Sequence, residues 1–364
     1  MKRALTGAHG RRLIHMVIAT LGLLLLAPVL AQDAAGRVDA VLSAELEAGR
    51  IPGAAVAIAK DGKVVFAKGY GRADVEKDVA ARPDTVFRIG SITKQFTGAA
   101  ILLLRDEGKL SIDDPLSKFL PDYPRGKDVT VRHLLTHTSG IKSYTGLKEW
   151  RPILAEDRSP EEMVRLFRDL PFEFEPGEKF AYNNSGFFLL GVVVEKAAGL
   201  PYGEFLRKKV FEPLEMKGTW VDAPKLEVKS RAVGYKAAQK GFKEDDPISM
   251  TQPGAAGAMI STVEDLLRWD AALHSGKVLK KESLEEMLTP AKLKDGKATR
   301  YGYGIFVAGE GERRQVEHGG GINGFVSYLG RFPAKGLAVA VLVNRQGYEA
   351  KALASKALKA FEGE

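Results

Sequence analysis

Two residues at the start of one predicted helix could form a nucleophile and its base. Residues 87–110 begin with a short apolar run and continue with apolar residues at helical spacing, which predicts a buried helix with Ser91 at its N-cap. Lys94 follows three positions later, on the same helix face. Burial lowers the pKa of a lysine toward that of a general base, and helix N-terminal N–H groups favour developing negative charge. The pair fits either a serine nucleophile with an internal base or an ordinary capped core helix.

The same Ser-x-x-Lys spacing occurs a second time, at Ser139 and Lys142. That copy lies in a loop-like stretch rich in Thr, Ser and Gly, whereas Ser91 directly follows an apolar run and opens a helix. A lysine in the first turn of a buried helix is partly desolvated, and desolvation lowers its pKa. The context therefore favours Ser91 over Ser139 as the candidate nucleophile.

A tyrosine and an asparagine lie two positions apart just before another predicted helix, over residues 185–198. The phenol of Tyr182 could exchange a proton with a lysine, and the amide of Asn184 could orient a lysine and a substrate carbonyl. Alternatively, Asn184 or Ser185 only caps the helix while Tyr182 packs.

A glycine-rich segment, residues 318–324, lies between two predicted strands and begins with His318. Glycines permit a ligand to approach the backbone closely, so an N–H group here could complete an oxyanion hole. The alternative is a flexible turn. The absence of a G-x-S-x-G elbow from the chain counts strongly against an oxyanion loop of the α/β-hydrolase type.

Metal and thiol chemistry find little support in the sequence. The chain has no cysteine, which excludes disulfides, thiolate metal sites and a cysteine nucleophile. His133 and His137 stand four apart, as zinc ligands do on a helix, but the Glu of H-E-x-x-H and a third ligand are missing. We therefore expect structural roles for both histidines, no metal and no cofactor.

The N-terminus resembles a secretory signal peptide. Residues 1–31 combine a basic leader, an apolar run too short for an ordinary membrane span, and a small residue at the end. We expect cleavage and an exported, periplasmic or secreted protein. The alternative is an uncleaved anchor, which would be the protein's only membrane contact.

The remaining charges do not indicate nucleic-acid binding. The whole chain carries +8, from 54 basic and 46 acidic residues, and four of the basic residues lie in the leader. The rest is therefore near +4 (50 − 46), with basic and acidic residues interspersed.

The order of elements predicts the architecture. Asp61-Gly62 separates two β-rich runs and indicates a hairpin, and an apolar run without alternation over 337–344 indicates a central strand. The other predicted elements are helices over 36–50, 160–170 (capped by Ser159), 185–198, 202–210, 262–274 (capped by Ser261) and 350–361, strands over 301–308, 314–317 and 324–332, and a loop with short extended pieces over 225–251.

Strands therefore occur at both ends of the mature chain, with helices between them. The prediction is an α/β (α+β) fold: a mostly antiparallel sheet built from both chain ends and flanked by helices, with an inserted helical lobe. We expect one domain over 32–364, with a sheet lobe over 32–110 and 289–364 and a helical lobe over 111–288. A cleft between the lobes is the default place for a site.

The three motifs in this order resemble the serine β-lactamase and penicillin-binding-protein superfamily. The likeness is greatest to its class C β-lactamase-like branch, which includes esterases, D-aminopeptidases and D,D-carboxypeptidases. Further stretches that resemble this branch are FRIGSITKQFT (87–97), HLLTHTSGI (133–141), PGEKFAYNNSGFFLLG (176–191), FEPLEMKGT (211–219), GAMISTVEDLLRW (257–269) and HGGGINGF (318–325).

The resemblance implies a β-lactamase-like serine hydrolase domain that needs no cofactor. Ser91 would attack a carbonyl, with Lys94 and Tyr182 as the proton-transfer pair. Asn184, His318 and Gly320 would bind substrate, and the N–H groups of Ser91 and Gly321 would form the oxyanion hole; these five residues, together with Lys94 and Tyr182, are the predicted site.

One departure from the family pattern bears on the substrate. β-Lactamases carry Lys where this chain has His318, and a histidine is largely neutral at pH 7. We therefore rank an esterase or D-peptide hydrolase, D,D-carboxypeptidase-like, above a class C-type β-lactamase. A slowly acylated sensor without turnover is the alternative of another class. The expected partners are small-molecule esters, D-peptides or β-lactams and no nucleic acid; the oligomeric state is not predicted.

Overall fold

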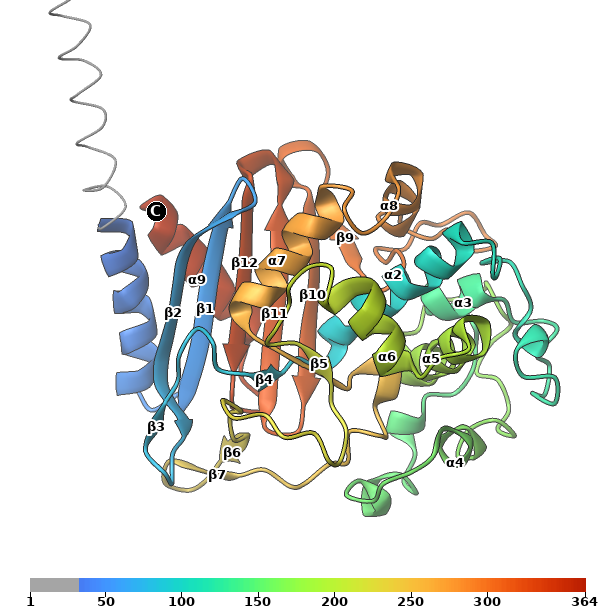
Figure 1. The fold of residues 1–364 in the computed structure, drawn as a ribbon, viewed down its shortest axis with the longest axis horizontal. Helices are drawn as coiled ribbons and strands as arrows, with labels where there is room; N and C mark the ends of the chain where they lie inside the picture. Colours follow the sequence, from blue (N-terminus) through green and yellow to red (C-terminus); the bar gives the residue numbers. More distant parts are fainter. Residues whose placement is uncertain (1–32) are drawn as a thin grey trace, which may run out of the picture.

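A seven-stranded antiparallel sheet forms the centre of the protein, in a computed structural model that describes residues 33–364 (Figure 1). The strand order is β3-β2-β1-β12-β11-β10-β9. Strand β1 (Gly53–Lys60) pairs with β12 (Leu337–Val343), so the two chain ends meet in the middle of the sheet, as predicted. The other strands of this sheet are β2 (Lys63–Asp74), β3 (Val79–Ala80), β9 (Phe306–Ala308), β10 (Gln315–Ile322) and β11 (Phe325–Phe332).

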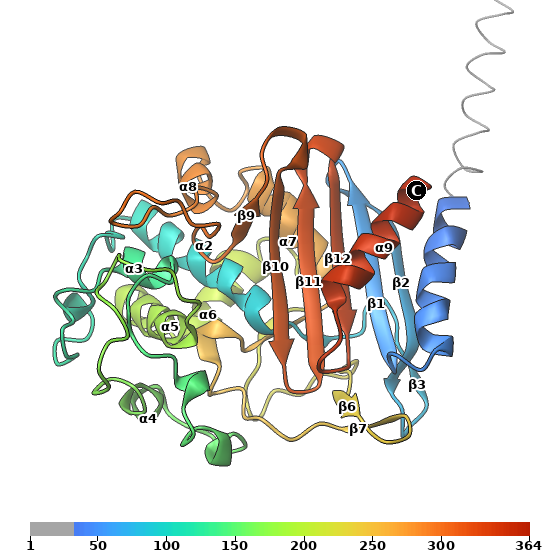
Figure 2. The same ribbon diagram turned by 180° about the vertical axis from the view of Figure 1, so that it is seen from behind.

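Two terminal helices cover one face of the sheet (Figure 2). They are the helix over residues 33–47 and α9 (Ala350–Glu362). Their apolar faces pack on alternate side chains of the central strands in a separate core cluster, which includes Val38, Leu42, Leu353, Val56 and Val341. The predicted leader, residues 1–31, lies outside the described residues.

The opposite face of the sheet carries α7 (Val263–His274), which contacts β12 and β1. Because α7 and α9 contact β12 from the two faces (Figures 1 and 2), all seven residues of that strand are buried, and the prediction of a central strand is confirmed. Helix α7 belongs to the middle of the chain, which the sequence analysis assigns to the helical lobe, yet it packs on the sheet.

The rest of the middle of the chain is mostly helical and packs around α2 (Thr93–Asp106) and α5 (Asn184–Ala198) in the larger core cluster. Its other helices are α3 (Val131–Leu135), α4 (Pro160–Arg165), α6 (Tyr202–Leu206) and α8 (Lys281–Met287). Short strands form two small sheets, β4 (Phe87–Arg88) with β8 (Met259–Ser261) and β5 (Trp220–Val221), and β6 (Tyr235–Ala237) with β7 (Phe242–Glu244).

Several predicted element boundaries are wrong, and the helix predicted over 36–50 covers residues 33–47. The capping box at Ser159 is present, but α4 ends at Arg165 rather than 170. Thr262, not Ser261, caps α7, because Ser261 still pairs in β8. The strand predicted over 301–308 covers only Phe306–Ala308, since Gly304 has a φ of +80°, which breaks the extended chain. The last of them, at the glycine-rich segment, concerns the site and is described with it.

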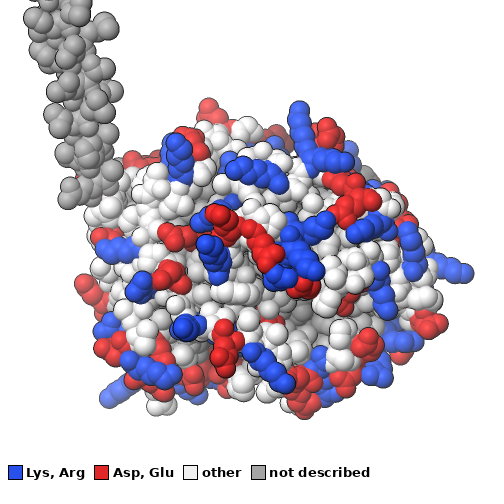
Figure 3. All heavy atoms as spheres, in the orientation of Figure 1, with Lys and Arg blue, Asp and Glu red and all other residues white. Residues whose placement is uncertain are grey.

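Lys and Arg are interspersed with Asp and Glu on the face shown in Figure 3. Many charged side chains of the protein form ion pairs, such as Arg125 with Glu175 and Arg132 with Asp113. Within residues 33–364, no helix is both long and apolar enough to cross a membrane.

Candidate active site

Ser91 lies in a tight turn between a strand and the central helix. Strand β4 leads into a 3-10 turn over Gly90–Ile92, and α2 begins at Thr93. The predicted N-cap is wrong: Ile92 occupies that position, and no side chain caps the helix. The extra 3-10 turn places Ser91 one step before the helix, so its hydroxyl is not used by helix N–H groups. The hydroxyl is therefore available to the cavity.

Lys94 is fully buried beneath Ser91. Its Nζ lies 3.2 Å from Ser91 Oγ, 2.8 Å from Asn184 Oδ1 and 2.7 Å from the carbonyl oxygen of Ala256. The side chain is 0% exposed, and burial lowers the pKa of this lysine well below its ordinary value of 10.5. The structure thus brings Ser91, Lys94 and Asn184 together.

The partners of Lys94 suit a neutral amine. The oxygens of Asn184 and Ala256 can only accept, so they take the two hydrogens of an –NH₂ group. The remaining lone pair then has Ser91 Oγ as its neighbour. This arrangement fits a base that removes the hydroxyl proton of Ser91.

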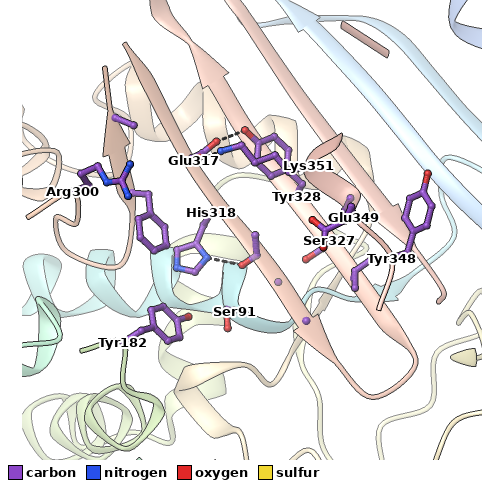
Figure 4. A pocket seen from close by; sticks show the side chains of 17 residues that line it. Ser91, Tyr182, Arg300, Glu317, His318, Ser327, Tyr328, Tyr348, Glu349 and Lys351 are labelled. Atoms are coloured by element: carbon purple, nitrogen blue, oxygen red, sulfur yellow. Dashed lines mark hydrogen bonds and ion pairs between the residues drawn. The ribbon is translucent and has the colours of Figure 1, made fainter. Parts of the chain in front are cut away.

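Tyr182 faces Ser91 from the other side of the cavity, with its hydroxyl pointing toward the serine (Figure 4). Lys94 Nζ lies 4.9 Å from the centroid of the tyrosine ring. Tyr182 is 38% exposed, because one part of the residue is open to the cavity. Burial of its other parts nevertheless raises the pKa of Tyr182, while contact with the Ser91 hydroxyl opposes this shift. Tyr182 is therefore protonated at neutral pH and could donate.

Asn183, and not Asn184 or Ser185, caps α5. Its Oδ1 accepts from the N–H of Gly186 at 2.7 Å. Asn184 is consequently the first residue of the helix, with its amide free to reach Lys94 through Oδ1 and Thr145 through Nδ2 at 3.2 Å. The capping role and the site role thus belong to neighbouring residues.

His318 lies within strand β10 rather than in a turn, so the prediction of a glycine loop over 318–324 is wrong. Strand β10 continues to Ile322 and pairs with β11 throughout. His318 Nδ1 lies 2.6 Å from the carbonyl oxygen of Gly319, which only accepts, so Nδ1 carries the proton and Nε2 accepts from Tyr301 at 3.0 Å. Burial and the nearby Lys94 lower the pKa of His318 to about 3, so this histidine is neutral at pH 7.

Glycines allow β10 to pack against the turn that carries Ser91. A Cβ on Gly320 would lie 2.0 Å from the carbonyl oxygen of Ile89, so only glycine permits this contact. Gly90, with a φ of +50°, likewise lies against Gly321. Gly321 itself has open space where a side chain would be. The sequence did not predict β10 here, because the packing that favours glycine comes from a segment far away in the chain.

The free edge of β10 faces the Ser91 turn. Strand β9 pairs with β10 only at Gln315, Val316 and Glu317, so from His318 onward this edge has no strand partner among the described residues. Gly321 therefore lies beside Ser91, where both line the same cavities. Their backbone N–H groups are therefore the candidates for an oxyanion hole.

Two buried residues of the site were not found by sequence reasoning. Tyr301 is 0% exposed and connects His318 to the aromatic group around Tyr182. His137 accepts from the N–H of Asn183 with Nδ1 at 3.0 Å and from the N–H of Ala181 with its carbonyl oxygen at 3.0 Å. It thus holds both neighbours of Tyr182. No spacing signal could reveal either residue, because their partners are distant in sequence.

The two histidines considered as zinc ligands have structural contacts instead. His133 belongs to the capping box of α3, and His137 contacts the backbone around Tyr182. Among residues 33–364, no group of three or more histidine or carboxylate side chains is arranged to hold a metal ion.

Two cavities meet at Ser91. One, of about 560 Å³, contains Tyr182, His318 and Gly320 and extends to charged residues near α9 (Figure 4). The other, of about 350 Å³, contains Asn184 and extends toward Tyr144 and Trp150. A substrate could therefore place its reacting bond at Ser91 with one part in each cavity.

A serine next to a buried lysine, in a turn against strand β10 and with Tyr182, Asn184 and His318 around it, defines a protein of the serine β-lactamase and penicillin-binding-protein superfamily. Residues 38–362 match the family described as Beta-lactamase. The chain therefore belongs to the beta-lactamase family, and the resemblance stated from the motifs is confirmed.

Related proteins include penicillin-binding proteins and an amidase. Penicillin-binding protein 4* of Bacillus subtilis (strain 168) is 30% identical over 293 residues, which are 76% of this chain and 64% of that protein. The octameric penicillin-binding protein homologue from Pyrococcus abyssi is 35% identical, with a TM-score of 0.78 over 90% of this chain and 77% of that one. A D-amino acid amidase from Ochrobactrum anthropi SV3 is 26% identical, with a TM-score of 0.80 over 91% of this chain and 99% of that one. This chain spans about 64% of the length of the curated relatives it matches.

Proposed function

We propose that this protein is a serine hydrolase that forms an acyl-enzyme on Ser91 with a small-molecule ester or a D-amino-acid peptide. The observation that carries the proposal is the geometry of Lys94: a fully buried amine whose two hydrogens have acceptors and whose lone pair adjoins Ser91 Oγ. A merely structural lysine would need a carboxylate, and none contributes to its pKa.

Acylation then uses the site in two steps. Ser91 Oγ bonds to the substrate carbonyl carbon while its proton passes to Lys94, and the N–H groups of Ser91 and Gly321 stabilise the oxyanion. When the tetrahedral intermediate collapses, the bond to the leaving group breaks. The leaving oxygen or nitrogen takes a proton from Tyr182, which regains one from Lys94.

Deacylation reverses the roles. Water bonds to the ester carbon as one of its protons passes to Tyr182, which passes its own proton on to Lys94. The bond to Ser91 Oγ then breaks as that oxygen takes this proton back from Lys94. The protein's own residues supply every proton acceptor and donor in both half-reactions.

The neutral His318 supports an esterase or D-peptide hydrolase over a β-lactamase. A pKa of about 3 leaves no positive charge at this position at pH 7, where a lysine would attract the carboxylate of a β-lactam. Because the relatives include penicillin-binding proteins, two alternative functions remain: a class C-type β-lactamase, and a protein that is acylated slowly without turnover. Cleavage of the leader and export to the periplasm or medium are part of this proposal, and they rest on residues 1–31 alone.

Three substrates offered in parallel test the proposal: a p-nitrophenyl ester, a D-amino-acid peptide and a chromogenic cephalosporin. We expect turnover of the first two classes, slow or no cephalosporin hydrolysis, and a mass increase confined to the peptide that contains Ser91. The Ser91→Ala variant is the control. Full activity in that variant, or no adduct with any of the three, would refute an acyl-enzyme on Ser91.

A further inference from the structure

The two cavities that meet at Ser91 differ in charge. The larger, here called the charged cavity, is lined by Arg300, Glu317, Glu349 and Lys351 as well as Tyr182 (Figure 4). The smaller, here called the aromatic cavity, is lined by side chains that include Tyr144, Trp150, Ile248, Pro253 and Ile322. None of the described residues that line the aromatic cavity is Asp, Glu, Lys, Arg or His.

The position of Tyr182 tells which part of a substrate enters which cavity; this step rests on the proposed function. Tyr182 gives its proton to the leaving group, so the leaving group must lie on the tyrosine side. Tyr182 lines the charged cavity and not the aromatic one, whereas Asn184 lines only the aromatic cavity. The acyl group therefore extends past Asn184 into the aromatic cavity.

Two aromatic rings form part of the wall of the aromatic cavity. The rings of Tyr144 and Trp150 pack edge to face, with centroids 5.3 Å apart. The indole N–H of Trp150 donates to Gln252 at 2.7 Å, and Asn184 Oδ1 already accepts from Lys94. The indole N–H and Asn184 Oδ1 thus already have hydrogen-bond partners, and the rings offer mainly apolar contact to an acyl group.

We infer that the aromatic cavity selects an uncharged apolar or aromatic acyl group, such as an N-acylated D-amino acyl group, and rejects an acyl group with a free α-ammonium. An ammonium that leaves water for this cavity would find no carboxylate there, and an unpaired charge is costly to bury. The inference narrows the proposed substrates to esters and peptides whose acyl side is blocked.

A matched pair of substrates tests this preference: N-acetyl-D-phenylalanine p-nitroanilide and D-phenylalanine p-nitroanilide. At about pH 6 the second carries an ammonium, and we expect kcat/KM to favour the acetylated compound about tenfold or more. At about pH 9, where an α-amino group has lost its proton, the ratio should fall. Equal or faster turnover of the ammonium compound at pH 6 would overturn the inference while leaving the proposed function standing. If neither compound acylates Ser91, and p-nitrophenyl butyrate does not either, the proposed function itself fails and the inference fails with it.

A designed charge at the rim of the aromatic cavity tests where the acyl group lies. Gln346 lines this cavity and is exposed, and Gln346→Glu adds a carboxylate with almost no change of shape. We expect the preference for the acetylated substrate at pH 6 to fall about threefold or more, since the new carboxylate attracts the ammonium. Gln346→Met, of similar length and uncharged, should keep the wild-type ratio. An unchanged ratio in Gln346→Glu would overturn the placement of the acyl group in this cavity.

Discussion

The chain contains Ser-x-x-Lys twice, and the two copies have different structures. Ser91 and Lys94 span a 3-10 turn and the start of α2, and their side chains meet at 3.2 Å. Ser139 and Lys142 lie in a segment without helix, where Gly140 has a φ of +73°. Backbone bonds from Glu173 to Gly140 and from Gly177 to Thr138 hold this second segment against a neighbouring one.

The difference shows that the backbone, and not the spacing, makes a nucleophile and base pair. Residues three apart are neighbours on a helix, with Cβ atoms about 5–6 Å apart, but lie about 10 Å apart along an extended chain. In the second copy, Ser139 Oγ accepts from the N–H of Ile141 at 3.3 Å, and Lys142 contributes its carbonyl oxygen to Ser185 Oγ at 2.8 Å. Both residues of that copy thus make local structural bonds.

Substitution of Ser91 should have the largest effect on activity. Ser91→Ala removes the atom that bonds to the acyl group, so we expect kcat/KM for a p-nitrophenyl ester to fall by about 10⁴-fold or more. Steady-state kinetics and mass spectrometry of the adduct measure the effect, with thermal unfolding as a check on folding. An adduct in the Ser91→Ala variant, on Ser139 or elsewhere, would break the comparison.

Substitution of the two lysines, Lys94 and Lys142, should change activity by amounts that differ almost as much. Lys94→Met keeps the length of the side chain and its burial but has no base, so we expect acylation to slow by about 10²–10⁴-fold. Because an amine leaves the core, the free energy of unfolding should not fall greatly. Lys142→Met is the matched control and should retain nearly all activity. Comparable losses in both variants would contradict the assignment of Lys94 as the base.

Removal of the contacts that hold Tyr182 should have a smaller effect. His137→Leu removes the acceptor for the N–H of Asn183 at a position with a φ of +58°, and we expect kcat to fall about ten- to a hundredfold through misplacement of Tyr182. His137→Asn keeps an acceptor and tolerates this φ, so it should recover part of kcat. If Asn and Leu variants lose the same activity at equal stability, the hydrogen bond to Asn183 does not position Tyr182.

The pH profile of kcat/KM should show a single ionisation, that of Lys94 in the first Ser-x-x-Lys copy. Burial lowers the pKa of Lys94, and its neutral form is the base, so kcat/KM should rise with pH, at most about tenfold per unit, and level off above that lowered pKa. His318, with a pKa of about 3, should add no step between pH 5 and 8. The profile of Lys142→Met should match the wild type. A fall of kcat/KM with rising pH in this range would mean that the charged lysine is the active form.

Much of the fold and the members of the site could be predicted because their signals are local. The hairpin at Asp61-Gly62, the apolar run of β12 and the capping box at Ser159 each depend on neighbouring residues, and each is confirmed. The site motifs Ser91-x-x-Lys94 and Tyr182-x-Asn184 are also local in sequence, since each pair lies within one turn or at one helix start.

The parts that could not be predicted depend on distant contacts. A glycine-rich segment has low strand propensity, and β10 forms there because β11 pairs with it and Ile89 packs against Gly320. Ser91 differs from an N-cap only through the 3-10 turn, which apolar periodicity does not reveal. Tyr301 and His137 enter the site through residues 17 and 46 positions away in the chain.

Substitution of Ser139 should have the smallest effect on catalysis. In contrast to Ser91, this serine should contribute to stability and not to the reaction. Ser139 is 2% exposed and accepts a hydrogen bond from the N–H of Ile141 beside the segment that holds Tyr182. Ser139→Ala leaves that N–H without its side-chain acceptor, so we expect a loss of about 1 kcal/mol in the free energy of unfolding. The rate of acylation should change less than about threefold, because the side chain does not reach Lys94 or Ser91. Urea unfolding and single-turnover acylation measure the two quantities separately. A loss of acylation without a loss of stability would show that the second copy also takes part in the chemistry, and the distinction between a catalytic and a structural Ser-x-x-Lys would fail.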